Sequence, residues 1–179
     1  YGYCVFDGFS FVCGCYCGLY LFKYGHRGNN NNNNSNSGNS IPTLTNTLII
    51  NVGHSIYKVI FNRIDSSFNT AIAPCNDGVI RIYNLKFSDS TPFQELKGHK
   101  HEVYAVALHK TKKILASSSN DFRIGIWDMK VTDQEIKAKF LLGHTDNVRQ
   151  IIWLEKSNHS ILISGSWDSS IRCWNVDQM

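Results

Sequence analysis

Two sets of residues in the second half of the chain have the types that nucleophilic catalysis uses. Each set holds a histidine, a serine and an aspartate in that order: His99, Ser117 and Asp121, then His144, Ser164 and Asp168. In a serine hydrolase, a histidine base activates one exposed serine beside an oxyanion hole, while an aspartate orients the histidine. Because the set recurs here, we interpret it as architecture and predict that the protein is not an enzyme.

Cysteines near the N-terminus have the chemistry to bind a soft metal ion. Cys13, Cys15 and Cys17 are each separated by one residue, and Cys4 is close in sequence. Zinc sites usually use pairs with about two to four intervening residues, whereas alternate residues of a strand project to one face. A buried cysteine packs as a small hydrophobic residue. We therefore favour a packed strand, keep metal binding as the alternative, and predict no cofactor.

The composition restricts the class of protein. Hydrophobic residues make up 42% of the 179 residues and charged residues 18%, which is enough to build a core. A net charge of +4 is too small to indicate a nucleic-acid partner, so we expect other proteins as partners. Six cysteines are too few for a disulfide scaffold, and the apolar stretch 9–22 is too short to span a bilayer. We expect an intracellular, cytoplasmic protein and leave a nuclear location open.

The chain contains an internal repeat. Gly-His pairs stand at 53–54, 98–99 and 143–144, a period of 45 residues. Each pair is followed by an aspartate and, six residues after the aspartate, by an aromatic residue: Asp77 and Tyr83, Asp121 and Trp127, Asp168 and Trp174. Three markers with one period indicate a repeat architecture.

Between the markers, the pattern is that of β-strands. Residues 103–108 alternate, and the small-residue strand 114–119 follows before a tight turn and a third strand. A fourth short strand, such as 93–96, precedes the next Gly-His pair. Four strands in 45 residues are typical of a propeller blade. Cys75 and Cys173 fall in such strands and are expected in the core.

These motifs resemble those of the WD-repeat (WD40) family, whose repeats carry a Gly-His…Trp-Asp signature. The resemblance implies an all-β fold, a partial β-propeller of about three to four blades of four antiparallel strands. We place repeat 1 at about 53–97, repeat 2 at about 98–142 and repeat 3 at about 143–179. The chain begins with Tyr1, so we expect a fragment of a seven-bladed ring that missing chain completes.

The N-terminal part is predicted to hold the remains of another blade. Residues 1–24 are interpreted as a degenerate partial blade with its second and third strands. Residues 25–40 are an Asn-rich, low-complexity insertion loop, because asparagine tracts cannot bury apolar surface. The WD40 repeats then occupy 41–179, beginning with a fourth strand at 44–50.

The resemblance also implies a hydrogen-bonded relay of four side chains within each repeat. The two complete sets are His99, Ser117, Asp121 and Trp127, and His144, Ser164, Asp168 and Trp174. In repeat 1 only His54 and Asp77 remain, because Ala73 and Tyr83 stand where the serine and the tryptophan are expected.

A protein-binding face is expected on the side of the Gly-His loops. The family pattern points to three kinds of position: the residue before the turn aspartate, an outward residue early in the first strand, and the residue two before it. The candidates are Trp167, Arg149, Tyr104, Tyr57, Asn120, Asn76, Glu102 and Asn147. An exposed indole is a strong interface anchor, and Arg149 could clamp a carboxylate or a phosphate. The alternative is that Trp167 packs against the loop of a neighbouring blade.

We therefore predict a non-catalytic WD40-repeat scaffold that mediates protein–protein interactions within a multiprotein complex. The alternative is a WD40-type cargo or peptide receptor, because residues 102–106 resemble part of the peroxisomal targeting-signal receptor of the same family.

Overall fold

The computed structural model describes residues 3–6, 10–14, 18–25, 43–61, 70–85, 91–109, 111–130, 135–156 and 159–178. The Asn-rich segment from residue 26 onward, Cys15, Cys17 and the side chains of Cys4 and Cys13 lie outside the described residues, so the predictions made for them stay predictions.

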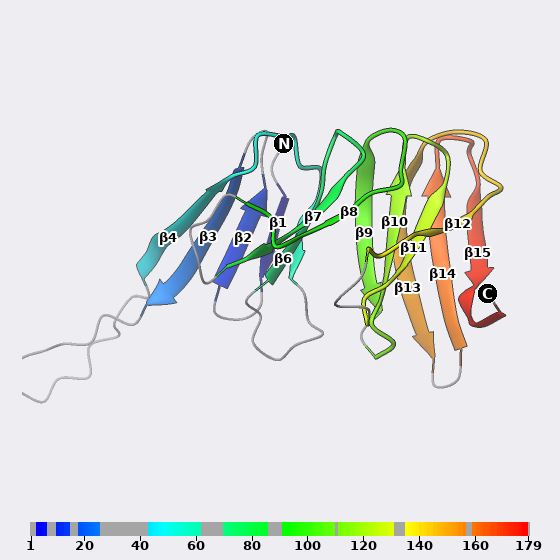
Figure 1. The fold of residues 1–179 in the computed structure, drawn as a ribbon. Coiled ribbons are helices and arrows are strands. Elements are labelled where there is room, and N and C mark those ends of the chain that lie inside the picture. Colours follow the sequence, from blue (N-terminus) through cyan, green and yellow to red (C-terminus); the bar gives the residue numbers. More distant parts are fainter. Residues whose placement is uncertain are drawn as a thin grey trace, which may run out of the picture.

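The described chain consists of β-strands and one short 3-10 turn (Figure 1). The elements are β1 (Tyr3–Phe6), β2 (Ser10–Gly14), β3 (Gly18–Gly25), β4 (Thr43–Asn51), β5 (Ile60–Phe61), β6 (Thr70–Pro74), β7 (Ile80–Asn84), β8 (Gln94–Leu96), β9 (Val103–His109), β10 (Ile114–Ser119), β11 (Ile124–Asp128), β12 (Lys139–Leu141), β13 (Val148–Lys156), β14 (His159–Ser166), β15 (Ile171–Asn175) and η1 (Val176–Gln178). No helix among the described residues is long and apolar enough to cross a membrane.

Strands that follow one another in the chain pair with one another. Three sheets have four strands, β1–β4, β5–β8 and β9–β12, and β13–β15 form a three-stranded sheet. All the pairs are antiparallel. The predicted all-β architecture of successive antiparallel sheets is confirmed. The division of the chain at residues 24 and 40 stays a prediction.

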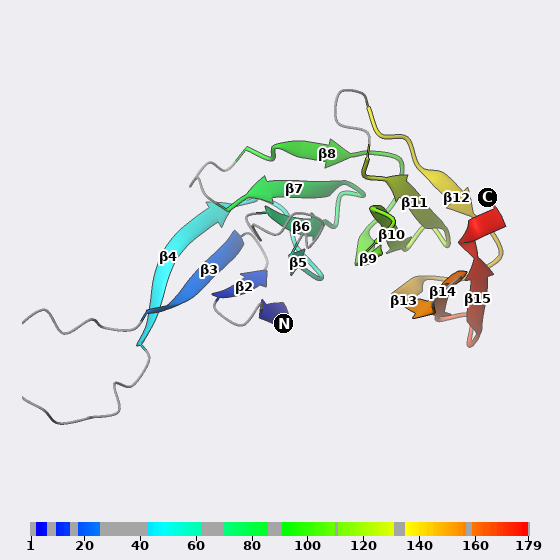
Figure 2. The same ribbon diagram turned by 90° about the horizontal axis from the view of Figure 1, so that it is seen from below.

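The four sheets stand side by side in an arc (Figure 1), and the view from below shows its curvature (Figure 2). Strands β5, β9 and β13 lie along the inner side of the arc, and β4, β8 and β12 lie along the outer side.

The hydrophobic core lies between neighbouring sheets rather than in one central cluster. Between β5–β8 and β9–β12, for example, Ile72 and Ile82 pack with Val106 and Trp127. Similar clusters lie between β1–β4 and β5–β8 and between β9–β12 and β13–β15. This arrangement buries both faces of the middle sheets, as stacked repeats require.

Directed polar contacts also join the last two sheets. The Trp153 indole N–H on β13 donates to the carbonyl oxygen of Ala107 on β9 at 3.0 Å. His109 at the end of β9 lies 2.8 Å from the Ser160 hydroxyl on β14, measured from Nε2 to Oγ. A hydrogen bond has a preferred direction, so these contacts restrict how the two sheets can slide past each other.

The turn between the second and third strands needs a left-handed backbone. The residue after the turn aspartate has φ of 83° at Gly78, 67° at Phe122 and 65° at Ser169. Glycine adopts this conformation without steric cost, whereas a residue with a Cβ loses about 1 kcal/mol. The same turn geometry therefore recurs in three sheets although its residue changes.

Candidate functional site

In sheet β9–β12, four polar side chains form one hydrogen-bonded relay. His99, in the loop before β9, donates from Nδ1 to the Asp121 carboxylate at 2.9 Å. Its Nε2 lies 2.8 Å from Ser117 Oγ on β10, and that oxygen accepts the Trp127 indole N–H at 2.8 Å. The relay ties the Gly-His loop to the turn after the second strand.

The sheet β13–β15 repeats this arrangement. His144 Nδ1 lies 2.6 Å from the Asp168 carboxylate, and its Nε2 lies 2.8 Å from Ser164 Oγ on β14. The Trp174 indole N–H donates to the same hydroxyl at 2.8 Å. The four side chains of each set are therefore in contact in both sheets.

The relays keep their aspartates ionised. Burial alone would raise the pKa of Asp121, but hydrogen bonds from His99 and Arg123 outweigh it and hold the pKa below its ordinary value. For Asp168, the hydrogen bond from the Ser170 hydroxyl is the largest influence, and His144 adds a second that lowers the pKa. Each carboxylate can therefore serve as a permanent acceptor.

The two serines are placed as acceptors inside the sheets. Ser117 has no exposed surface, and Ser164 has 1% of its surface exposed. Each hydroxyl already bonds to a histidine and accepts an indole N–H. A nucleophile must reach its substrate, whereas these hydroxyls are buried and already hydrogen-bonded. Their geometry therefore suits a structural role rather than acyl transfer.

Sheet β5–β8 holds its turn aspartate in a different way. Arg81 on β7 makes a bidentate pair with Asp77, with nitrogen–oxygen distances of 3.0 and 2.7 Å. His54 Nε2 lies 3.4 Å from the same carboxylate, and Arg81 Nε also donates to Glu95 at 3.1 Å. Sequence reasoning missed Arg81, although an arginine four residues after the aspartate was the available signal.

The serine position and the residue paired with it differ between β5–β8 and β9–β12. Ser117 pairs with Gly125 across β10 and β11, whereas Ala73 pairs with Arg81 across β6 and β7. A Cβ on Gly125 would lie 2.6 Å from Ser117 Oγ. Within β9–β12 the relay therefore requires the empty space at Gly125. In β13–β15, Ser164 pairs with Arg172 and the relay still forms, so a glycine at the paired position is not a general requirement.

Four of the predicted interface residues form a continuous row of ring and cation contacts. The Tyr57 and Tyr104 rings meet edge to face, with centroids 5.1 Å apart. The Arg149 guanidinium carbon lies 3.9 Å from the Tyr104 ring centroid and 4.8 Å from that of Trp167. Trp167 is 61% exposed. We call these four residues the aromatic row, and it brings together side chains from three successive sheets.

The other four predicted interface residues support the loops beside this row. Asn120 donates from its backbone N–H to the Glu102 carbonyl at 2.9 Å, and its side-chain amide donates to the Glu102 carboxylate at 2.7 Å. The Trp167 backbone N–H donates to the Asn147 carbonyl at 2.9 Å. Asn76 accepts the Ser55 N–H at 3.2 Å. The side chains of Asn76, Asn120 and Glu102 and the backbone of Asn147 hold these loops. Of the residues before the turn aspartates, only Trp167 carries a large ring.

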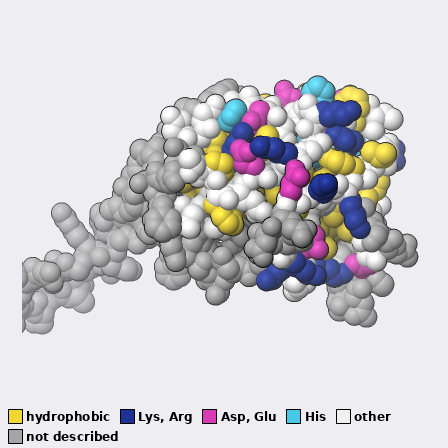
Figure 3. Space-filling view, in the orientation of Figure 1, with side chains coloured by type: hydrophobic (Ala, Val, Ile, Leu, Met, Phe, Trp, Pro, Cys, Tyr) yellow, Lys and Arg dark blue, Asp and Glu magenta, His cyan; other side chains and the backbone are white. Residues whose placement is uncertain are grey.

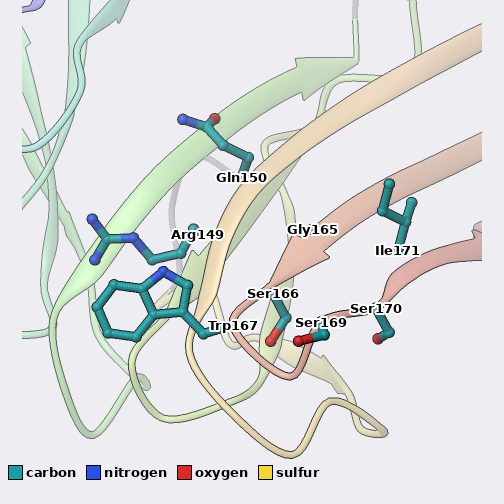
Figure 4. Close-up of a pocket in the computed structure, with 8 residues that line it drawn as sticks. All are labelled: Arg149, Gln150, Gly165, Ser166, Trp167, Ser169, Ser170 and Ile171. Carbon is teal, nitrogen blue, oxygen red and sulfur yellow. The ribbon is translucent and has the colours of Figure 1, made fainter.

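An open hollow of about 460 Å³ lies next to Trp167. Figure 4 shows Arg149 beside the indole and Ile171 across the hollow from them. The lining residues are Arg149, Gln150, Gly165, Ser166, Trp167, Ser169, Ser170 and Ile171. Trp167 is thus a surface residue, and the alternative in which a neighbouring loop buries it does not describe this structure.

Two cysteines expected in the core have different surroundings. Cys75 is buried, and burial raises the pKa of its thiol to about 11, so the thiol is protonated at neutral pH. Cys173 is exposed, so the prediction for it is wrong. Cys173 and the 78% exposed Ile171 lie on a face of β13–β15 that no described sheet covers.

Metal-binding residues do not gather in the described part of the chain. No group of three or more His, Cys, Asp or Glu side chains among those residues could hold a metal ion. On the face shown in Figure 3, Lys and Arg side chains are interspersed with Asp and Glu side chains.

Known proteins share these repeats. The model of the family WD40, described as "WD domain, G-beta repeat", matches residues 90–128 and 136–175. These two segments are therefore WD40 repeats, and the all-β structure with its antiparallel sheets is consistent with blades of a partial β-propeller. Repeat 1, indicated by the Gly-His pair at 53–54, stays a prediction.

Several curated proteins are similar to parts of the chain. The "Ribosome biogenesis protein WDR12 homolog" of Arabidopsis thaliana is 26% identical over 145 residues, which cover 65% of this chain and 33% of that protein. "Nuclear distribution protein PAC1" of Candida albicans is 35% identical over 106 residues, 58% of this chain and 21% of that protein. "THO complex subunit 3" of Arabidopsis thaliana is 38% identical over 90 residues, 46% of this chain and 26% of that protein. The chain therefore spans about a fifth to a third of the length of these relatives.

Proposed function

We propose that the chain is a non-catalytic interaction module, and that a partner protein binds to the aromatic row of Tyr57, Tyr104, Arg149 and Trp167. The observation that carries this proposal is the continuous row itself, which ends in an exposed indole. Aromatic and arginine side chains supply most of the binding energy at protein interfaces.

The row is also organised before a partner arrives. Arg149 lies against two rings, so less side-chain freedom is lost on binding than for a solvated arginine. The relays of His99 and His144 hold the neighbouring turns in place. One relative is named as the subunit of a complex, which agrees with a scaffolding role in a multiprotein assembly.

We do not propose catalysis by the Ser-His-Asp sets, because their hydroxyls are buried and already bonded. Other proteins remain the predicted partners, and the predicted cytoplasmic or nuclear location stays a prediction.

Affinity purification of the tagged full-length protein from cells that express it, followed by mass spectrometry, tests this function. The double variant Tyr104→Ala/Trp167→Ala should lose partners that the wild type retains. Phe93→Ala is the matched control, because it removes an equally exposed aromatic ring beside the outer strand β8. If the double variant keeps every partner while its thermal unfolding is unchanged, the proposed binding face is wrong.

A further inference from the structure

We propose that the partner segment bound at the aromatic row is an acidic peptide. Its Asp or Glu carboxylate pairs with Arg149, and a neighbouring apolar side chain lies in the hollow beside Trp167. This inference rests on the proposed function, because it assigns a chemistry to the partner of that same face.

Arg149 is placed to receive a carboxylate. Its guanidinium carbon lies over the Tyr104 and Trp167 rings, and a guanidinium presents its donors in a planar fork that matches a carboxylate. Arg81 and Arg123 each pair with a turn aspartate. No carboxylate among the described residues lies within ion-pair distance of Arg149, so its charge is available to a partner.

The hollow beside Arg149 is suited to an apolar side chain. Its exposed surface includes the Trp167 indole and Ile171, which is 78% exposed. Two of its hydroxyls already have acceptors: Ser166 donates to the Asp146 carbonyl at 2.9 Å, and Ser170 donates to the Asp168 carboxylate at 2.6 Å. Apolar contact is therefore the main interaction that this surface can make with a partner side chain.

The surroundings favour a carboxylate over a phosphate. A guanidinium fork can bind either a carboxylate or a phosphate with two parallel hydrogen bonds, so the surrounding charge decides between them. The carboxylate of Asp168 follows Trp167 directly, and the loop of Asp146 is adjacent. These negative charges repel a dianion more strongly than a single carboxylate.

Selection of random peptides displayed on phage, with the full chain as bait, tests the proposal. We expect selected peptides to be enriched in Asp or Glu with an apolar residue nearby. For a synthetic peptide from the selection, Arg149→Ala should weaken binding at least about tenfold, and Arg149→Lys should recover only part of it. Lys137→Ala removes one exposed positive charge elsewhere and should leave binding unchanged.

The other outcomes separate this inference from the proposed function. If the selected peptides lack acidic residues but bind the Trp167→Ala variant more weakly than the wild type, the aromatic row is still the binding face. The proposal of an acidic partner is then wrong. Tighter binding after the acidic residue is replaced by phosphoserine would overturn the carboxylate. Selection of no peptide, or of peptides that bind Tyr104→Ala and Trp167→Ala like the wild type, would overturn both proposals. Near-ultraviolet circular dichroism of each variant establishes that it is folded.

Discussion

The sheets β5–β8 and β9–β12 hold equivalent turn aspartates by different chemistry. In β9–β12 the Asp121 carboxylate is the end of a relay through His99, and its side chain is only 3% exposed. In β5–β8 the Asp77 carboxylate is 28% exposed and pairs with Arg81. Asp121 also pairs with Arg123, so the two sheets differ in the histidine relay and in the burial of the carboxylate rather than in whether an arginine is present.

This difference shows that the turn, rather than the relay, is the invariant requirement of the fold. Gly78 and Phe122 occupy the same left-handed position although the side chains around them differ. What varies is the pair formed by the serine position and its partner on the third strand, which is Ser117 with Gly125 in β9–β12 and Ala73 with Arg81 in β5–β8. The histidine relay in β9–β12 and the Arg81–Asp77 ion pair in β5–β8 therefore accompany the same turn geometry.

Filling the space at Gly125 should have the largest effect. In Gly125→Ala the new methyl group would lie 2.6 Å from Ser117 Oγ and 2.9 Å from the Trp127 nitrogen, so the relay must separate. We expect a loss of about 3 kcal/mol in the free energy of unfolding, measured by urea denaturation. Gly165→Ala is the control, because no atom lies within 4 Å of its added Cβ. Equal losses in both variants would contradict the role of this space.

Removing the central hydroxyl should come next. Ser117→Ala leaves both the Trp127 indole N–H and the His99 Nε2 without their partner inside the sheet. We expect a loss of about 2 kcal/mol, because buried polar groups that lose their hydrogen bond keep their desolvation cost. The comparison variant is Ser166→Ala, whose hydroxyl lies nearer to solvent and bonds only backbone groups. A loss no larger than that of Ser166→Ala would show that the relay adds little.

Breaking the ion pair should cost less. Arg81→Ala removes the contacts to Asp77 and Glu95, but water can reach both carboxylates, so we expect a loss of about 1 kcal/mol. This loss should shrink in high salt, whereas that of Ser117→Ala should not. Urea denaturation of both variants at low and high ionic strength makes the comparison. If the two variants respond equally to salt, the relay and the ion pair do not differ in the way proposed.

The smallest expected effect is on the response to acid. The pKa of Asp121 is below its ordinary value of 3.8 in the folded chain, so the carboxylate stabilises the fold above about pH 4 and this contribution falls as the pH decreases further. Asp121→Asn should therefore flatten the decline in stability below pH 4. Asp77→Asn should flatten it less, because the Asp77 carboxylate is more exposed. Denaturation midpoints between pH 7 and pH 3 measure both slopes.

Much of the fold follows from local patterns in the sequence. The Gly-His period and the alternation in 103–108 indicate β-strands, and β9 spans Val103–His109. The strand predicted at 114–119 matches β10. The relay set of His99 and its partners was expected from family motifs, because its members belong to one repeat at fixed spacing. Hydrogen bonding within a sheet is set by strand register, which sequence periodicity reports.

Contacts between sheets could not be predicted in the same way. The stacking of Arg149 on Tyr104 joins β13 to β9 and depends on how two sheets are placed in space. The exposure of Cys173 likewise depends on which face another sheet covers, whereas its place in an alternating strand suggested burial. The substitution of Arg81 for the relay required knowing that Ala73 lies opposite it.

The relays also bear on the order in which the chain folds. The hydrogen-bonded partners within a sheet are close in sequence, 10 residues apart for Trp127 and Ser117 and 22 for His99 and Asp121. The bonds between sheets join residues 46 and 51 apart, from Trp153 to Ala107 and from His109 to Ser160. Short loops close at a lower entropic cost, so we expect individual sheets to form before they dock. During that interval their apolar faces are still in water, and the refolding chain is then most prone to aggregate.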